Sequence, residues 1–170
     1  MKRIAKFEKV SFGQFAADWS KNFPDCTEDK IKEIYDAIPL PVRATAGSAG
    51  YDFCLPDEIS LEAGAGILIP TGIRAKIADG WVLNIYPRSG LGFKFRLQLD
   101  NTVGIIDADY YNAANEGHIM VKVTNDGRQG KTLSLERGKG FAQGVFLPFG
   151  ITVDDAADGD RVGGFGSTNV

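Results

Sequence analysis

Several segments of the chain combine glycine with side chains of the types that bind phosphate. One of them, Pro87-Arg-Ser-Gly-Leu-Gly92, follows a predicted strand and offers a guanidinium, a hydroxyl and backbone amides that two glycines leave accessible. Arginine binds an anion as a two-pronged donor, and bare amides can line a concave nest for one. Taken alone, the segment is more simply a turn capped by Ser89 with an exposed Arg88.

A second segment, from Asn101 to Tyr110, carries two carboxylates close to a glycine. If it stays extended, strand alternation places Asp107 and Asp109 on one face. Ile106 and Tyr110 then share the other face. Such carboxylates could orient and deprotonate a water molecule or help to hold the hydration shell of a metal ion. A solvated acidic turn is the alternative.

Two further segments, Gly138-Lys-Gly-Phe-Ala-Gln143 and Arg161-Val-Gly-Gly-Phe-Gly-Ser-Thr168, repeat the combination. Phe165 could lie on the face of a base while neighbouring amides, Ser167 and Thr168 bind phosphate; an incidental hydrophobic anchor is the alternative. Taken together, these segments indicate a site for a nucleotide polyphosphate.

The distribution of glycine divides the elements that must position these groups into a head and a body. Of the 21 glycines, only Gly13 precedes Gly47. The head begins with a strand-like run, Ile4 to Val10, and its residues 11–38 have the pattern of two short helices. Capping signals, Ser11 with Gln14 and Asp25 with Glu28, predict where the helices start. A helical hairpin packed on the body is the favoured interpretation, and a docking surface for a regulatory protein partner is the alternative.

The body has the texture of an all-β protein, with short apolar segments between turn signals. Residues 154–170 are acidic and then glycine-rich, and they predict a flexible C-terminal arm. The predicted strands of the body are Tyr51–Leu55, Gly66–Pro70, Ile73–Ile77, Val82–Tyr86, Ile119–Thr124, Thr132–Leu135 and Ala142–Leu147.

Composition limits the classes of function. The 170 residues, with 19 basic and 22 acidic side chains, predict a single domain, residues 1–170, with a formal charge of −3. Without a run of Lys or Arg, a nucleic-acid partner is not expected, and without an apolar stretch of about 20 residues, neither is a membrane span. Cys26 and Cys54 fit no zinc spacing and predict free thiols in a reducing, cytoplasmic compartment. His118 is the one histidine, and nothing near it in sequence supplies a triad or a metal cluster.

Five segments, in order along the chain, together resemble the five motifs of the trimeric deoxyuridine triphosphatase (dUTPase) family. They are Ala49-Gly-Tyr-Asp-Phe53, Pro87-Arg-Ser-Gly-Leu-Gly92, Gly104-Ile-Ile-Asp-Ala-Asp-Tyr110, Gly138-Lys-Gly-Phe-Ala-Gln143 and Gly163-Gly-Phe-Gly-Ser-Thr168. The resemblance implies a mainly β fold, a jelly-roll-like β barrel with the helical head as an insertion, assembled as a homotrimer with active sites at subunit interfaces. It also implies hydrolysis of dUTP to dUMP and pyrophosphate with Mg²⁺, by attack of water on the α-phosphorus.

The same resemblance implies a role for individual residues. Asp107 would activate the water, and Tyr110 would lie under the deoxyribose and exclude a ribose. Mg²⁺ would meet the protein mainly through water, so no direct protein ligand is expected, although Asp52 could support the site indirectly. The substrate-binding residues would be Asn101, Gly104 and Ile106 at the uracil, Arg88, Ser89, Gly90 and Gln143 at the phosphates, and Arg161, Phe165, Gly166, Ser167 and Thr168 from the arm.

The chain departs from the family pattern in places. Gly140 stands where members commonly have Arg, with Lys139 beside it, and Arg161 is one residue closer than usual to the Gly-Gly pair. Residues 111–118 are longer than in the shortest members, and the head is an addition to the minimal barrel. A dCTP deaminase or bifunctional deaminase on the same fold, and a regulatory binding protein switched by nucleotide, are the alternative functions.

Overall fold

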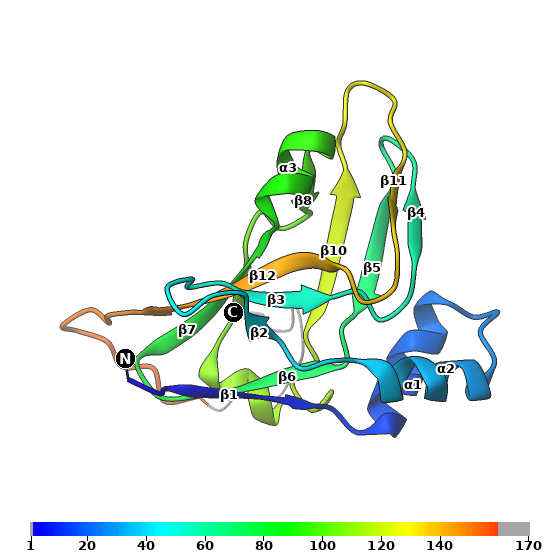
Figure 1. Ribbon diagram of the computed structural model, residues 1–170. Coiled ribbons are helices and arrows are strands. Elements are labelled where there is room, and N and C mark those ends of the chain that lie inside the picture. The colour runs from blue at the N-terminus through cyan, green and yellow to red at the C-terminus, as the bar shows by residue number, and fades with distance from the viewer. Residues whose placement is uncertain (1, 160–170) are drawn as a thin grey trace.

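The computed structural model describes residues 2–159, which are mainly β (Figure 1). The helices are α1 Phe12–Asn22, α2 Glu28–Ala37, α3 Ser89–Phe95 and the 3₁₀ helix η1 Ala108–Asn112. The strands are β1 Ala5–Lys9, β2 Val42–Arg43, β3 Tyr51–Cys54, β4 Ile59–Leu61, β5 Gly66–Pro70, β6 Ile73–Ile77, β7 Trp81–Pro87, β8 Leu97–Leu99, β9 Gly104–Ile106, β10 Met120–Asn125, β11 Leu133–Leu135 and β12 Gly140–Pro148. The expectation of a mainly β chain is confirmed.

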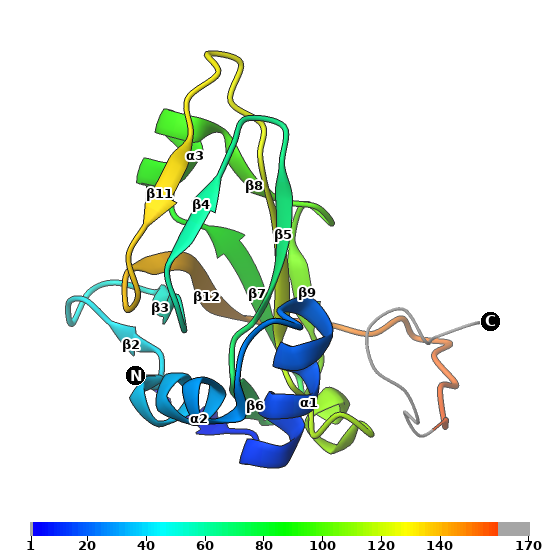
Figure 2. The same cartoon turned by 90° about the vertical axis from the view of Figure 1, so that its right-hand side faces the viewer.

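The strands form four sheets, and every ladder is antiparallel. The orders are β2-β3-β12-β7-β9, β5-β10-β8, β1-β6 and β11-β4. Within residues 2–159 these ladders do not close into a continuous barrel, since the largest sheet ends at β2 and β9, which pair with one strand each. These edge strands are two and three residues long. The sheets instead stand around a shared apolar core (Figure 2).

The predicted strands of the body are where short apolar segments between turn signals indicate them. All seven body strands predicted from the sequence are present, with ends shifted by at most two residues. Strands β2, β4, β8 and β9, each of two or three residues, were not predicted from the sequence. Tertiary pairing, rather than local pattern, makes these segments strands.

Both helices of the head begin at a side-chain cap. The hydroxyl of Ser11 accepts a hydrogen bond from the backbone N–H of Gln14, as the capping signal predicts. The predicted start at Asp25 is wrong, since α2 begins two residues later, where the Thr27 hydroxyl accepts from the N–H of Lys30. Both residue types serve as N-caps, and Thr27 occupies the position directly before the first helical turn.

The head is part of the core of the molecule. Strand β1 pairs along its length with β6, and the Phe7 ring packs edge-on against Phe53 with ring centroids 5.7 Å apart. Phe15 of α1 and Ile34 of α2 are fully buried. The interpretation of a helical hairpin packed on the body is therefore confirmed, and the two helices lie together at one end of the strands in Figures 1 and 2.

Two simple expectations can be compared directly with the described residues. Cys26 and Cys54 are both free thiols, as predicted. Burial, with the neighbouring Asp52 carboxylate, raises the pKa of Cys54. Among residues 2–159, no helix combines the length and the apolar character that crossing a membrane requires.

We predict that Phe15→Ala lowers the free energy of unfolding by about 3–5 kcal/mol, because it empties a fully buried position between head and body. Urea titration at fixed protein concentration measures the change. Ser20→Ala, on the exposed side of the same helix, is the control and should stay within about 0.5 kcal/mol. Equal stability of the Phe15 variant and the parent would contradict the placement of α1 in the core.

Candidate active site

The arginine-bearing segment is a helix start and not the turn that the sequence suggests. Arg88 is the last extended residue after β7, and α3 begins at Ser89. Arg88, Ser89 and Gly90 are exposed, and they line an open pocket of about 540 Å³. Lys94 and Lys139 line the same pocket. This arginine pocket therefore gathers three cationic side chains and two serine hydroxyls, donors that suit a polyphosphate, together with the Glu136 carboxylate.

Two glycines give the side chains beside this pocket their space. A Cβ atom on Gly140 would lie 2.7 Å from Nη1 of Arg88, and one on Gly50 would lie 2.7 Å from Oε1 of Gln143. Arg88 thus lies across the backbone of β12, with its Nε atom 3.4 Å from Oδ1 of Asp52. The Gln143 amide donates to the carbonyl of Pro87 at 3.2 Å. Gly140 is not simply a missing arginine, because it makes room for Arg88.

A second pocket, of about 350 Å³, lies along β9. Asn101, Gly104 and Ile106 line it together with apolar side chains that include Ile85 and Leu99. The pocket is mostly apolar, and its polar side chains are those of Asp100, Asn101 and Lys122. An apolar cleft with a few polar groups has the character of a nucleobase site.

Asp107 follows β9 directly, next to Ile106, which lines this base pocket. The chain does not stay extended, so the expected alternation of Asp107 and Asp109 on one strand face is wrong. Instead η1 begins at Ala108, and the Asp107 carbonyl accepts a hydrogen bond from the N–H of Tyr110 at 3.2 Å. Asp107 is extended, whereas Asp109 lies inside the 3₁₀ helix that follows it. The two carboxylates therefore do not share one face of a strand.

Tyr110 is almost completely buried, at 2% exposure. Its hydroxyl donates to the backbone carbonyl of His118 at 2.8 Å, and the side-chain amide of Asn115 donates to the same hydroxyl at 2.8 Å. The expectation that Tyr110 lies under a deoxyribose stays a prediction. These bonds hold the segment from Asp107 to His118, here called the aspartate loop, in a compact form.

The two groups of predicted site residues lie at opposite ends of β7. Ile106 is paired with Leu83, so Asp107 follows at the level of Val82, whereas Arg88 is beyond the other end. Six residues of strand at about 3.3 Å each separate them by about 20 Å. The arginine pocket and the base pocket accordingly share no lining residue in the described part of the chain. Arg161, Phe165, Gly166, Ser167 and Thr168 lie outside the described residues.

Asp52 is a carboxylate next to the arginine pocket, which Glu136 also lines. It lies on β3 opposite Gln143 of β12 and pairs with Arg88. Magnesium usually keeps several waters and binds through one or two carboxylates together with substrate phosphates, so this donor set fits an ion held chiefly by a nucleotide. No group of three or more His, Cys, Asp or Glu side chains within residues 2–159 could hold a metal ion by itself.

The fold and these segments match known proteins. A family model described as dUTPase matches residues 36–169. The chain belongs to the dUTPase family. A relative from Pectobacterium carotovorum, named deoxyuridine 5'-triphosphate nucleotidohydrolase, is 46% identical over 137 residues, which cover 76% of this chain and 86% of that protein. The resemblance inferred from the five motifs is thereby confirmed.

Solved dUTPase structures share the fold. The dUTPase from Streptococcus mutans is 37% identical, with a TM-score of 0.62 over 88% of this chain and 98% of that one. The dUTPase of phage phi11 of S. aureus, whose structure shows coordination of a structural Mg(II) ion, is 19% identical and has a TM-score of 0.62 over 92% of this chain and 98% of that one. The family match begins at residue 36, so most of the head precedes it.

The aspartate loop is also tied to β1, which the sequence did not indicate. Glu8 accepts a hydrogen bond from the Tyr111 hydroxyl and forms ion pairs with Lys6 and with Arg74, at 2.7 and 3.4 Å. The hydrogen bonds from Lys6 and Tyr111 lower the pKa of Glu8 from 4.5 to about 2.

This lowered pKa predicts a pH-dependent contribution to stability. A carboxylate whose pKa falls on folding stabilises the folded chain above its usual pKa of 4.5, and that contribution is lost as the pH falls through about 2. Glu8→Gln should therefore lower the melting temperature most at about pH 6, with the difference shrinking toward about pH 2. Calorimetric unfolding of both proteins across this range measures it. Glu62→Gln, at an exposed position, is the control, and a Glu8 difference that grows on acidification would contradict the prediction.

Proposed function

We propose that the protein hydrolyses dUTP to dUMP and pyrophosphate, with Asp107 as the base that activates the attacking water. The observation that carries the proposal is that Asp107 directly follows Ile106, the last residue of β9 and part of the pocket lining. A carboxylate that directly follows β9 is placed to act on a nucleotide whose base occupies the pocket that β9 lines. Water attack on the α-phosphorus then needs a proton acceptor there, and a carboxylate serves this role.

Recognition of uracil is proposed to rest mainly on backbone groups. Gly104 and Ile106 of β9 both line the pocket, so their backbone amides and carbonyls can form hydrogen bonds with the edge of the base. Asn101 lies at the exposed side of the pocket, where its amide can contribute a further hydrogen bond. Backbone donors and acceptors in fixed positions reject a cytosine, because its amino group presents a donor where the pocket also presents one.

The phosphates are proposed to bind in the arginine pocket. Arg88 and Ser89 supply donors at the start of α3, and Gly90 leaves a backbone amide accessible beside them. Gln143, Arg161, Ser167 and Thr168 are proposed to complete the contacts, with Phe165 and Gly166 closing over the base. Donors of this kind stabilise the charge that develops on phosphate oxygens, at about 2–4 kcal/mol for each one removed.

Mg²⁺ is proposed as the cofactor, with Asp52 supporting it through water beside the arginine pocket. When bound, the ion offsets negative charge on the triphosphate. Arg88 orients Asp52 through the ion pair between them, and Asp107 acts on the water separately, at the other end of β7.

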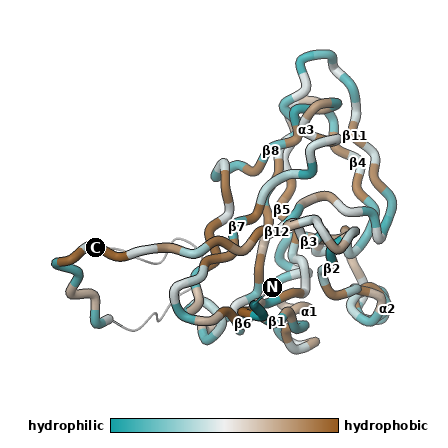
Figure 3. The backbone as a smooth tube through the Cα atoms, turned by 60° about the vertical axis from the view of Figure 1, so that its left-hand side comes forward, coloured by the Kyte–Doolittle hydropathy of each residue, from teal (hydrophilic) through white to brown (hydrophobic). Residues whose placement is uncertain are grey.

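We propose further that the complete site forms between copies of the chain in a homotrimer of jelly-roll-type subunits. Asp107 and Arg88 are about 20 Å apart in one chain, which is too far for both to act on one triphosphate. The chain after β12 leaves the body as an extended segment (Figure 3). At the end of β12 and after it, the apolar side chains of Leu147, Phe149, Ile151 and Val153 are exposed, which gives an apolar surface for another copy to cover.

The first test is Asp107→Asn. Loss of the base should lower kcat for dUTP by about 10²–10⁴-fold while a non-hydrolysable dUTP analogue binds within a few-fold of normal. Pyrophosphate release and calorimetry measure the two quantities. Asp126→Asn, which removes a carboxylate paired with Arg96 outside both pockets, is the control. Near-normal turnover by the Asp107 variant refutes its role, and release of ammonia from dCTP, or no pyrophosphate from dUTP, refutes the proposed reaction.

The second test mixes Arg88→Ala with Asp107→Asn in equal amounts, with unfolding and refolding to exchange subunits. If each site takes Arg88 from one chain and Asp107 from another, about a quarter of the sites in the mixture combine two intact residues and regain parental activity. Mixtures without exchange provide the baseline. Activity no higher than the sum of the separate variants would show that the two residues do not come from different chains.

A further inference from the structure

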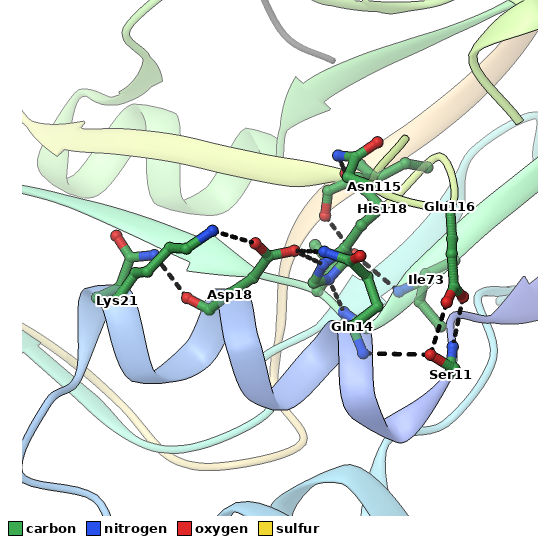
Figure 4. A network of polar contacts seen from close by, with 12 residues as sticks. Ser11, Gln14, Asp18, Lys21, Ile73, Asn115, Glu116 and His118 are labelled. Atoms are coloured by element: carbon green, nitrogen blue, oxygen red, sulfur yellow. Dashed lines mark hydrogen bonds and ion pairs between the residues drawn. The ribbon is translucent and has the colours of Figure 1, made fainter. Parts of the chain in front are cut away.

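The head contacts the aspartate loop at three separate places, and Figure 4 shows the two that involve α1. On β1, Glu8 binds Tyr111. At the start of α1, the Ser11 hydroxyl and backbone N–H donate to the two carboxylate oxygens of Glu116, at 2.6 and 2.7 Å. In the middle of α1, Asp18 binds His118. The family match begins at residue 36, so all three head residues precede it.

The contact between Asp18 and His118 is buried and specific. His118 is 0% exposed and Asp18 is 5% exposed. The backbone N–H of Gly72 donates to Nε2 of His118 at 2.8 Å, so Nε2 must accept and the proton of a neutral ring lies on Nδ1. That Nδ1–H donates to Oδ2 of Asp18 at 2.8 Å. The ring is therefore held from both sides in one tautomer and one orientation.

Asp18 itself is fully engaged. The side-chain amide of Gln14 donates to its Oδ2 atom at 2.7 Å, and the Lys21 ammonium lies 3.5 Å from Oδ1. Burial acts to raise the pKa of Asp18, but the hydrogen bonds from His118 and Gln14 outweigh it, and the pKa is lowered. A buried polar group whose bonds are all made is rigid, whereas one that loses a partner is costly.

The constraint passes from His118 to Asp107 through short local contacts. The His118 carbonyl accepts from the Tyr110 hydroxyl, and the Tyr110 N–H donates to the Asp107 carbonyl. Gly117 has a φ of +69° and passes so close to η1 that a Cβ atom on it would lie 2.7 Å from the Tyr110 carbonyl oxygen. The loop is thus folded tightly on itself, and one end of it is anchored to α1.

Turn hydrogen bonds fold the aspartate loop on itself, but no strand pairing fixes its position on the body. Its regular part is the five-residue η1, and no strand ladder includes residues 107–118. A segment outside the strand ladders depends on contacts with its neighbours for its position relative to the body. A displacement of about 1 Å in a reacting group can cost as much as about a hundredfold in rate.

We propose that the head is a brace for the catalytic geometry, in which Asp18 and His118 are positioning residues that hold the aspartate loop and, through it, Asp107. The proposal rests on the role proposed for Asp107. It assigns to a segment before the family match a part in catalysis that is distinct from its part in the core.

The test compares Asp18→Ala with Asp18→Asn, which retains an oxygen that can accept from His118. Asp18→Ala should lower kcat for dUTP by about tenfold to a hundredfold with KM changed less than about threefold, since the phosphate donors are untouched. Hydrogen–deuterium exchange of residues 107–118 should rise at least about tenfold, while β7 and β12 keep their protection. Asp18→Asn should recover most of the kcat and most of the protection of residues 107–118 from exchange.

A surface variant and a control keep the test independent of folding. Glu116 has a φ of +57°, which Asn tolerates, so Glu116→Asn shortens the side chain away from Ser11 without emptying the core. Glu116→Asn should raise the exchange of residues 107–118 and lower kcat, as Asp18→Ala does. Asp36→Ala removes a head carboxylate whose partner is Lys32 of the same helix, and it should change neither quantity.

The outcomes separate the brace from the proposed function. Unchanged exchange at residues 107–118 in both variants, or raised exchange with unchanged kcat, overturns the brace. If Asp36→Ala lowers kcat and raises exchange as much as Asp18→Ala does, the brace is also overturned, because any change in the head would then have the same effect. If the parent protein does not turn over dUTP, the proposed function fails, and the exchange measurement still shows whether the head orders the loop.

Discussion

Strand β7 is the element on which the geometry of both pockets depends. It is paired in antiparallel ladders with β12 on one side and β9 on the other. Leu83 and Ile85 are completely buried at its centre, so a slip of one residue would turn apolar side chains out of the core. The register that results sets Asp107 near one end of the strand and Arg88 beyond the other. A complete site therefore depends, in the proposed function, on a second copy of the chain.

The head is attached to the body by two different kinds of interaction. Apolar contacts of Phe15 and Ile34 favour burial, but they have little directional preference and specify a location more than an orientation. The hydrogen bonds between Asp18, His118 and Gly72 are directional, and they define how the aspartate loop lies against α1. The same segment thus contributes to the core and, in the proposed brace, to the alignment of a catalytic group.

The glycine excess of the body has specific structural uses near the site. At Gly140 the missing side chain leaves space for the Arg88 guanidinium beside Asp52, and at Gly117 the positive φ permits the turn that brings the aspartate loop back on itself. In the first case the residue at which the chain departs from the family pattern leaves room for the arginine that precedes α3. In the second case Gly117 has no side chain that could take part in chemistry, but it permits the fold of the loop that contains Asp107.

The sequence by itself determined the family, the residue types of the proposed site, the two helices of the head and the strands long enough to show alternation. Capping by Ser11 and the apolar stripe of α2 are local signals, and they are visible without a fold. Only the tertiary structure decided that β9 is a strand, that the chain turns into η1 after Asp107, and that Asp18 meets His118 across 100 residues of chain. These features depend on contacts between segments distant in sequence, and no local pattern encodes such contacts.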